Sequence, residues 1–196
     1  MTRIIAGAAG GRRLVTPPGE RTRPTSDRVR EALFSMLEAR GAVRGARVLD
    51  LFAGSGALGL EAASRGAAAV TLVDSSRQAV AAARRNAGAV TGAGGPAAVE
   101  VVLAPALRYL QQATGPAFDL VLLDPPYALG DDELATHLTA LAAPGRLAPG
   151  AVVVVERGAR GAGPRWPAGL VPERDRRYGE TVLWTARWTT TAGARR

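Results

Sequence analysis

The sequence predicts an α/β fold built on a doubly wound parallel sheet, with helices covering both faces. From residue 47 onward, short and nearly continuous apolar runs alternate with segments whose apolar residues recur at helical spacing. Such runs are typical of strands buried on both faces, and the segments between them are typical of crossover helices. The length of 196 residues and the 47% of hydrophobic residues suit one globular domain with its own core.

The residues before the sheet predict a hairpin and a helix. Short apolar runs at 3–7 and 10–15 surround glycines and predict an N-terminal β-hairpin, which the following Pro-Pro-Gly segment ends. A helix with one apolar face comes next; Thr25 or Ser26 can cap it, and Gly41 ends it.

The remaining chain alternates between strands and helices. The predicted strands are 48–52, 69–73, 99–103, 118–123, 151–156 and 181–188, and the predicted helices are 56–65, 76–87, 107–112 and 131–141. We expect residues 1–24 to form a basic hairpin arm, 25–190 the α/β domain and 191–196 a tail.

Composition excludes several kinds of site. The chain has no cysteine and one histidine, His137, which excludes disulfide scaffolds, thiolate zinc sites, cysteine nucleophiles and paired histidine ligands. A Ser-His-Asp hydrolase would have to use His137. We expect no metal. The N-terminal apolar run is too short for a secretory signal, and no run approaches the roughly 18 apolar residues of a membrane span. A cytoplasmic protein without membrane contact is expected.

Positive charge gathers in two parts of the chain. The net charge is +8, and all 25 basic residues are arginines. Residues 1–30 carry seven arginines against two acids, and residues 157–177 carry six against two. This distribution favours a polyanionic partner, although net charge alone does not separate nucleic acid binding from solubility.

A glycine-rich turn follows the first predicted sheet strand. The segment from Gly54 to Gly59 fits G-x-G-x-x-G, and Asp74 ends the next strand 20 residues after Gly54. This spacing suits a nicotinamide dinucleotide, and it equally suits S-adenosylmethionine, because Asp74 can accept from ribose hydroxyls in either. A plain turn with Asp74 as a helix cap is the structural alternative. Asp50 favours the methyl donor, because its carboxylate can meet an ammonium but would lie near a pyrophosphate.

A second motif closes the strand at 118–123. Asp124-Pro125-Pro126-Tyr127 should face the same crevice as the glycine turn, since both follow carboxyl ends of parallel strands. The prolines remove amide donors, so Asp124 and the Pro125 carbonyl can accept from a planar exocyclic amine, while Tyr127 stacks on the base. Alone, such a segment is usually a turn. Together with the glycine turn, it indicates an amine-directed methyltransferase acting on adenine N6, guanine N2 or a related amine.

Several segments together resemble a known family. They are Arg23-Pro-Thr-Ser-Asp-Arg-Val-Arg-Glu-Ala-Leu-Phe34, the hairpin at 3–7, the strand and glycine turn at 48–62, the motif at 123–127 and Tyr178-Gly-Glu-Thr. This set resembles the RsmD family of 16S rRNA guanine-N2 methyltransferases. The resemblance implies a Rossmann-like, seven-stranded methyltransferase sheet with an N-terminal β-hairpin extension. It also implies S-adenosylmethionine as donor and one guanine of 16S rRNA in the small ribosomal subunit, of the guanine 966 type, as acceptor.

The resemblance also implies roles for individual residues, and we expect a monomeric enzyme. The expected donor-site residues are Asp50, Phe52, Gly54, Ser55, Gly56 and Asp74, and the expected catalytic residues are Asp124, Pro125, Pro126 and Tyr127. The basic ends of the chain fit RNA: the expected RNA-binding residues are Arg12, Arg13, Arg21, Arg23 and Arg28, with Arg174, Arg176 and Arg177 flanking the site. The segment ending at Pro105 departs from the family pattern, because it offers no side-chain acceptor for the donor's adenine.

Three alternatives remain. A DNA adenine-N6 methyltransferase would use the same loop chemistry, but it usually needs a base-reading domain, for which no segment is long enough. A nicotinamide dehydrogenase would have only His137 for proton transfer. A non-catalytic RNA-binding module would not need the three carboxylates Asp50, Asp74 and Asp124.

Overall fold

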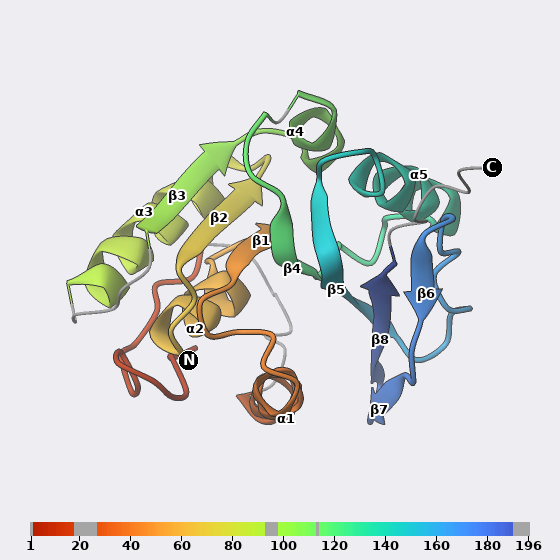
Figure 1. The fold of residues 1–196 in the computed structure, drawn as a ribbon. Helices are drawn as coiled ribbons and strands as arrows, with labels where there is room; N and C mark the ends of the chain where they lie inside the picture. Colours follow the sequence, from red (N-terminus) through yellow and green to blue (C-terminus); the bar gives the residue numbers. More distant parts are fainter. Residues whose placement is uncertain (1, 18–26, 93–97, 113, 190–196) are drawn as a thin grey trace.

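The computed structural model describes residues 2–17, 27–92, 98–112 and 114–189, in which one central sheet carries helices on both faces (Figure 1). The helices are α1 (Asp27–Ala39), α2 (Ala57–Ser64), α3 (Arg77–Thr91), α4 (Ala106–Gln112) and α5 (Asp131–Leu141). The strands are β1 (Arg47–Leu51), β2 (Ala69–Asp74), β3 (Ala98–Leu103), β4 (Phe118–Leu123), β5 (Leu147–Gly158), β6 (Leu170–Pro172), β7 (Arg176–Tyr178) and β8 (Thr181–Trp188).

The strand order confirms the doubly wound fold. The order is β3-β2-β1-β4-β5-β8-β6, with β7 paired to β8, and the pairs from β3 to β5 are parallel. The chain builds outward from β1 in one direction and from β4 in the other. The carboxyl ends of β1 and β4 therefore form a topological switch point, where such folds hold their ligands.

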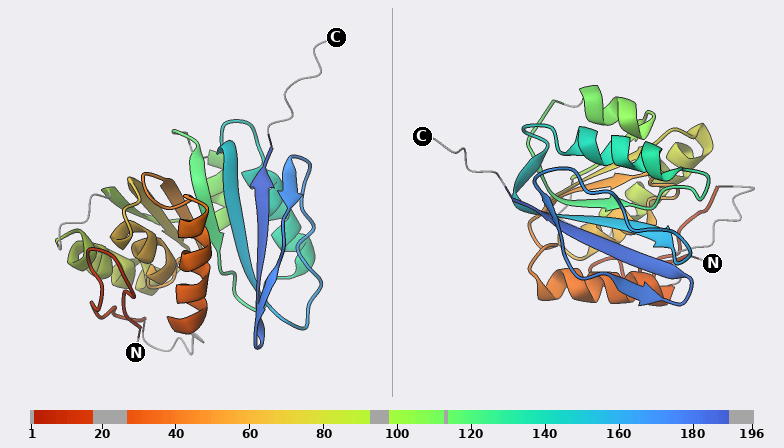
Figure 2. Two further views of the ribbon diagram at one scale, coloured as in Figure 1. Left: turned by 60° about the horizontal axis from the view of Figure 1, so that its bottom comes forward. Right: turned by 90° about the vertical axis from the view of Figure 1, so that its right-hand side faces the viewer.

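Buried strands divide the core into two layers. Alternate residues of β1, β4 and β5 face opposite sides; Leu120, Leu122 and Val154 join the core beneath α1, α2 and α3. Val121 and Val155 join the core beneath α4 and α5. Figure 2 shows α1 on one side of the sheet and α4 and α5 on the other. The two-sided burial explains why these strands read as continuous apolar runs.

Several element boundaries differ from expectation. The helix expected to end at 87 continues to Thr91, and Ser76 caps its start by accepting from the Ala79 amide at 3.3 Å. Strands β6 and β7 were not predicted, because each has three residues and shows no alternation. The predicted caps Thr25 and Ser26 lie outside the described residues, as does the expected tail. In the part of the chain that the structure describes, no helix has the length and apolarity needed to cross a bilayer.

The N-terminal segment folds back as a hairpin but pairs sparsely. Arg3 and Arg13 form one isolated antiparallel bridge, and the Ile4 amide donates to the Arg12 carbonyl at 2.9 Å. The segment lies against α2: the amides of Ile5 and Ala6 donate to the Glu61 carboxylate at 2.7 and 3.0 Å. Packing on α2, more than strand pairing, therefore holds this hairpin in place.

A buried charge network joins the hairpin to α1 and α2. The Glu61 side chain is fully buried and accepts from Arg65 Nε at 2.7 Å, and Arg30 Nε lies 3.8 Å from its other oxygen. Arg30 is itself buried, and its Nη2 donates to the Arg3 carbonyl and to Asp27. Burial lowers the pKa of Arg30, while Glu61 and Asp27 oppose that shift. Such buried charges are tolerated only when they are paired.

We expect Glu61→Gln to destabilise the protein by about 3–5 kcal/mol, because it leaves two buried guanidiniums without their shared counter-charge. Urea unfolding would measure the change. The control is Glu38→Gln, since Glu38 pairs with the same Arg65 from a half-exposed position; it should cost about 1 kcal/mol or less. Equal costs for the two variants would contradict the assigned role of Glu61.

Candidate functional site

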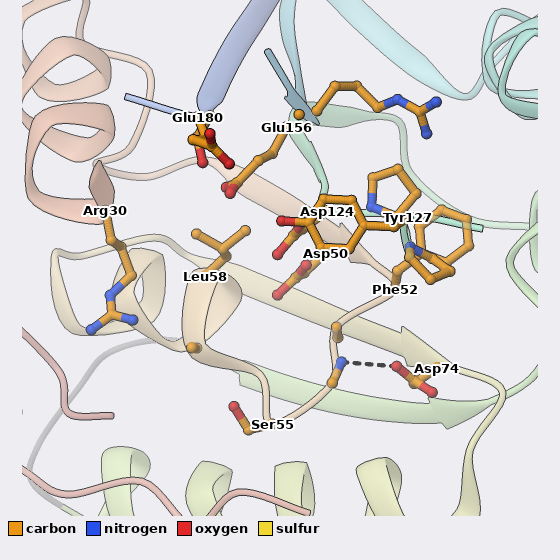
Figure 3. Close-up of a pocket in the computed structure, with 18 of the residues that line it drawn as sticks. Arg30, Asp50, Phe52, Ser55, Leu58, Asp74, Asp124, Tyr127, Glu156 and Glu180 are labelled. Atoms are coloured by element: carbon orange, nitrogen blue, oxygen red, sulfur yellow. Dashed lines mark hydrogen bonds between the residues drawn. The ribbon is translucent and has the colours of Figure 1, made fainter. Parts of the chain in front are cut away.

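A cavity of about 970 Å³ opens where the strand order reverses, at the carboxyl ends of β1 and β4 (Figure 3). The glycine turn after β1 and the Asp-Pro-Pro-Tyr segment after β4 both line it. The structure thus brings together two motifs that are far apart in the sequence. The predicted residues lining the cavity are Asp50, Phe52, Gly54, Ser55, Asp74, Asp124, Pro125, Pro126 and Tyr127.

Asp74 ties the glycine turn to the start of α3. One carboxylate oxygen accepts from the Gly54 amide at 2.8 Å, the contact dashed in Figure 3, and the other accepts from the Ser76 amide at 2.8 Å. Gly54 has a φ of 54°, in the left-handed region that favours glycine. Each carboxylate oxygen has a second lone pair, so Asp74 can hold the turn and also accept from a ligand hydroxyl.

Gly56 and Gly59 serve packing. A Cβ on Gly56 would lie 2.8 Å from Leu72 Cδ1, and one on Gly59 would lie 2.3 Å from Leu72 Cδ2. These glycines let α2 approach β1 and β2 closely. Gly56, expected at the donor site, is buried and is not among the described residues that line the cavity. Its contribution is to the shape of the turn.

Asp50 is a buried acid with one open position. Its Oδ2 accepts from the Gly59 amide at 2.8 Å, whereas its Oδ1 has no hydrogen-bond partner among the described residues. Burial, opposed by the Gly59 hydrogen bond and reinforced by the charges of Asp124 and Asp74, raises the pKa of Asp50 to about 8. A buried oxygen of this kind can take a donor from a ligand. An ammonium group, such as that of S-adenosylmethionine, fits this position.

Phe52 bends the chain out of β1 and into the turn. Its φ of 63° is left-handed and is rare for a bulky residue. Its ring contacts that of His137, with 5.4 Å between centroids. His137 is buried on α5, bonded to the Glu133 carbonyl, and does not line the cavity. The dehydrogenase alternative therefore has no histidine at this site.

The second motif lies at the cavity mouth, and hydrogen bonds from neighbouring residues hold it in place. The Leu129 amide donates to the Pro126 carbonyl at 2.9 Å, closing a turn after the motif. Arg157, from the end of β5, donates to the Leu129 carbonyl at 2.8 Å and to Asp131 at 2.9 Å. Tyr127 is 75% exposed at the cavity mouth. Its ring can therefore stack on a flat ligand while the turn behind it stays fixed.

Sequence reasoning missed part of the cavity lining. One missed group comes from the end of β5 and the residues after it, another lies at the β7–β8 turn, and a third comes from the N-terminal region, α1 and α2. These residues are Glu156, Arg157, Gly158, Ala159, Arg160 and Gly161; Glu180 and Thr181; and Thr2, Thr16, Arg30 and Leu58. No motif marks them, since their place depends on strand order and on the hairpin packing. The Glu156 carboxylate at the end of a predicted strand was the one available signal.

Asn86 on α3 was also missed. Its amide exchanges hydrogen bonds with the Val15 backbone at 2.8 and 2.9 Å, and its nitrogen donates to the Ser55 carbonyl at 2.8 Å. One buried side chain thus fixes the end of the hairpin against the glycine turn.

The predicted arginines occupy different places. Arg12 and Arg13 are exposed on the hairpin and do not line the main cavity, and Arg28 lines a smaller cavity of about 380 Å³ beside α1. Arg177 lines the main cavity, whereas Arg174 and Arg176 are exposed and do not. Arg21 and Arg23 lie outside the described residues. Pro105 is exposed and does not line the cavity. Within the described ranges, no group of three or more His, Cys, Asp or Glu is arranged to hold a metal.

Comparison with known proteins identifies the family of this chain. The sequence model of the family described as conserved hypothetical protein 95 matches residues 2–187. Ribosomal RNA small subunit methyltransferase D of Escherichia coli K12 is 38% identical over 180 residues, covering 92% of this chain and 86% of that protein. The chain belongs to the RsmD family.

Solved structures similar to this RsmD-family chain share its whole fold. The yhhF protein of Escherichia coli superposes with a TM-score of 0.82 at 34% identity, covering 96% of this chain and 98% of that one. A hypothetical protein of Thermus thermophilus has a TM-score of 0.77 at 34% identity, covering 94% of this chain and 98% of that one. The methyltransferase sheet predicted from the sequence is confirmed.

We expect Asp50 to make stability depend on pH. Because its folded pKa is raised to about 8, the native state binds one proton more than the unfolded state between about pH 4 and pH 8. This contribution is fully present at low pH and is lost, at about 1.4 kcal/mol per pH unit, as pH rises through the folded pKa. Relative to Asp50→Asn, the wild type should lose stability from pH 5 to pH 8 and then level off. A stability difference that stays constant over this range in urea unfolding would contradict the assignment.

Proposed function

We propose that this chain transfers a methyl group from S-adenosylmethionine to the exocyclic N2 of a guanine in 16S rRNA. The observation that carries the proposal is the single cavity lined on one side by Asp50, Gly54 and Asp74 and on the other by Asp124 to Tyr127. A relative sharing 38% identity is named ribosomal RNA small subunit methyltransferase D, which supports rRNA of the small subunit as the substrate. We also propose guanine 966 as the acceptor type, and a monomeric, cytoplasmic enzyme.

One wall of the cavity would hold the donor. Asp50 Oδ1, buried and unpartnered among the described residues, would accept from the donor's ammonium. The backbone of Gly54 and Ser55 permits close approach, and Asp74 would accept from the ribose hydroxyls. When bound, the donor supplies an electrophilic methyl group on a sulfonium.

The other wall would hold the target amine. The nitrogen of an exocyclic amine is a poor nucleophile, because its lone pair is delocalised into the base. Asp124 and the Pro125 carbonyl accept from its hydrogens and help to localise that lone pair on the nitrogen. Tyr127 stacks on the extruded base and fixes its plane. No strong base is needed, since the methylated amine is acidic before it loses its proton and water can take that proton.

Arginines would bind the RNA backbone around this cavity. Arg160 and Arg177 lie at the mouth, and the Arg160 side chain is 93% exposed. Arg12 and Arg13 on the hairpin and Arg28 on α1 are also exposed and can reach phosphates. We propose the same role for Arg21 and Arg23. Phosphate contacts give affinity without sequence selection, so selection of the base falls to the cavity.

The test incubates the protein and methyl-labelled donor with unmodified small ribosomal subunits or with duplex DNA, followed by nucleoside analysis. We expect label in rRNA as N2-methylguanosine and none in DNA. Label in DNA as N6-methyladenine would support the adenine alternative, and no label in either would support a non-catalytic module. A thermal shift with NADH and none with S-adenosylhomocysteine would support the dehydrogenase.

We expect Asp124→Ala to lower methyl transfer by about 100-fold or more while leaving S-adenosylhomocysteine affinity within about 2-fold, because Asp124 faces the amine and not the donor. Asp50→Ala should instead weaken S-adenosylhomocysteine binding, as measured by calorimetry. Asp132→Ala is the control, since Asp132 is exposed on α5 outside the cavity. If Asp124→Ala lost both methyl transfer and S-adenosylhomocysteine binding while remaining folded, the assignment of Asp124 to the amine and Asp50 to the donor would be contradicted.

RNA affinity should fall steeply with salt. Each lost phosphate contact should reduce the slope of log K against log salt by about 0.7 for single-stranded RNA. We expect this reduction for Arg12→Ala and Arg13→Ala in filter-binding titrations. Arg108→Ala is the matched control. Arg108 is exposed on α4, and α4 packs on the face of the sheet opposite to α1, α2 and α3. A flat salt response of the wild type would count against RNA as the partner.

A further inference from the structure

Three neighbouring strands each deliver a carboxylate to the cavity. In the parallel ladder, Leu51 pairs with Leu123 and Leu123 pairs with Val155, so β1, β4 and β5 reach the cavity in register. Asp124 and Glu156 follow the paired residues Leu123 and Val155 directly. Adjacent strands lie about 4.8 Å apart, which makes these two carboxylates neighbours at the cavity floor.

Strand alternation points these carboxylates to the same side of the sheet. Leu122 and Val154, two residues before Asp124 and Glu156, belong to the core layer beneath α1, α2 and α3. Side chains two apart on a strand share a face. Asp50 lies two residues after Val48, which is in the same layer. Figure 3 shows Asp50, Asp124 and Glu156 gathered on one side of the cavity.

Asp124 and Glu156 present carboxylate oxygens, which accept hydrogen bonds, to the cavity. Asp50, which we assign to the methyl donor's ammonium, lies on the same side of the cavity and leaves Asp124 and Glu156 for the base. Four arginines line the cavity, and their side chains are placed differently. Arg30 is buried beside Glu61, and Arg157 is bonded to Leu129 and Asp131, whereas Arg160 and Arg177 are exposed at the mouth. This arrangement suits a nucleotide that enters with the donor edge of its base inward and its phosphates outward.

We propose that Glu156 determines the choice of base, by accepting a hydrogen bond from the ring N1–H of the target guanine. The inference rests on the proposed function and deepens it. Guanine presents N1–H and N2–H side by side, so neighbouring carboxylates on β4 and β5 match that edge. Adenine presents a lone pair at N1, which a carboxylate repels. Asp124 thus engages the reacting amine, and Glu156 acts as a specificity residue one strand away.

Glu180 also lies near the mouth but is less suited to this role. Its side chain is 61% exposed and lies 3.8 Å from Arg160, and its carbonyl accepts from the Ala159 amide. Glu156 is half-buried at the end of a central strand. A half-buried carboxylate discriminates more strongly than an exposed one, because a mismatched base offers it a lone pair in place of a donor and less water is present to compensate.

The test is a double-mutant cycle in which one change is made in the protein and the other in the target base. Small subunits are reconstituted with guanine or 2-aminopurine at the methylated nucleotide; 2-aminopurine keeps the exocyclic amine but has no N1–H. For the wild type, we expect kcat/KM to fall by about 10–100-fold with 2-aminopurine. For Glu156→Gln, the penalty should shrink to within about 3-fold, because the glutamine amide can donate to the bare N1.

Two further variants sharpen the cycle. Glu100→Gln, exposed on β3 outside the cavity, should keep the full wild-type penalty. Glu180→Gln should also keep most of it. Unchanged S-adenosylhomocysteine affinity in Glu156→Gln would show that the donor wall is intact.

An equal 2-aminopurine penalty in the wild type and in Glu156→Gln would overturn the inference, as would a reduced penalty in Glu180→Gln alone. A wild type that methylates no guanine at all would instead refute the proposed function. The two failures are therefore distinguishable.

Discussion

The parallel register of β1, β4 and β5 is the constraint on which the site depends. Pairing of Leu51 with Leu123, and of Leu123 with Val155, brings the ends of the three strands to one edge. The glycine turn and the Asp-Pro-Pro-Tyr segment then face one cavity although 70 residues separate Gly54 from Asp124. A slip of one residue would turn Asp50 or Asp124 to the opposite face. Continuous burial on both faces of these strands makes such a slip costly.

Two buried acids, Glu61 and Asp50, differ in how many hydrogen-bond donors surround them. Glu61 is surrounded by donors: backbone amides from the hairpin and Arg65 from its own helix, with Arg30 beside it. Both of its carboxylate oxygens accept hydrogen bonds, and these bonds hold the N-terminal segment against α2. Asp50, equally buried, has one amide donor and one oxygen directed to no described partner. The first acid stabilises the scaffold, and we propose that the second binds a ligand.

Much of the fold and part of the site could be predicted from the sequence, for physical reasons. The buried strands read as apolar runs, and the two motifs at strand ends predicted a shared crevice before the strand order was known. Strands β6 and β7 were too short to show any period. Glu156 belongs to no sequence motif, and only the strand register, which places it beside Asp124, indicates a functional role. The motif alone does not distinguish a glycine needed for close packing, as Gly56 is on Leu72, from one needed for close approach to a ligand.

The most direct test of the account is a crystal structure of the protein with S-adenosylhomocysteine. We expect the ligand's ammonium against Asp50, its ribose hydroxyls against Asp74, and its sulfur facing the wall formed by Asp124 and Pro125. This would place the donor and the amine-binding segment in one cavity, as methyl transfer requires. A ligand bound at another surface, or one whose sulfur faces away from Asp124, would contradict the central claim.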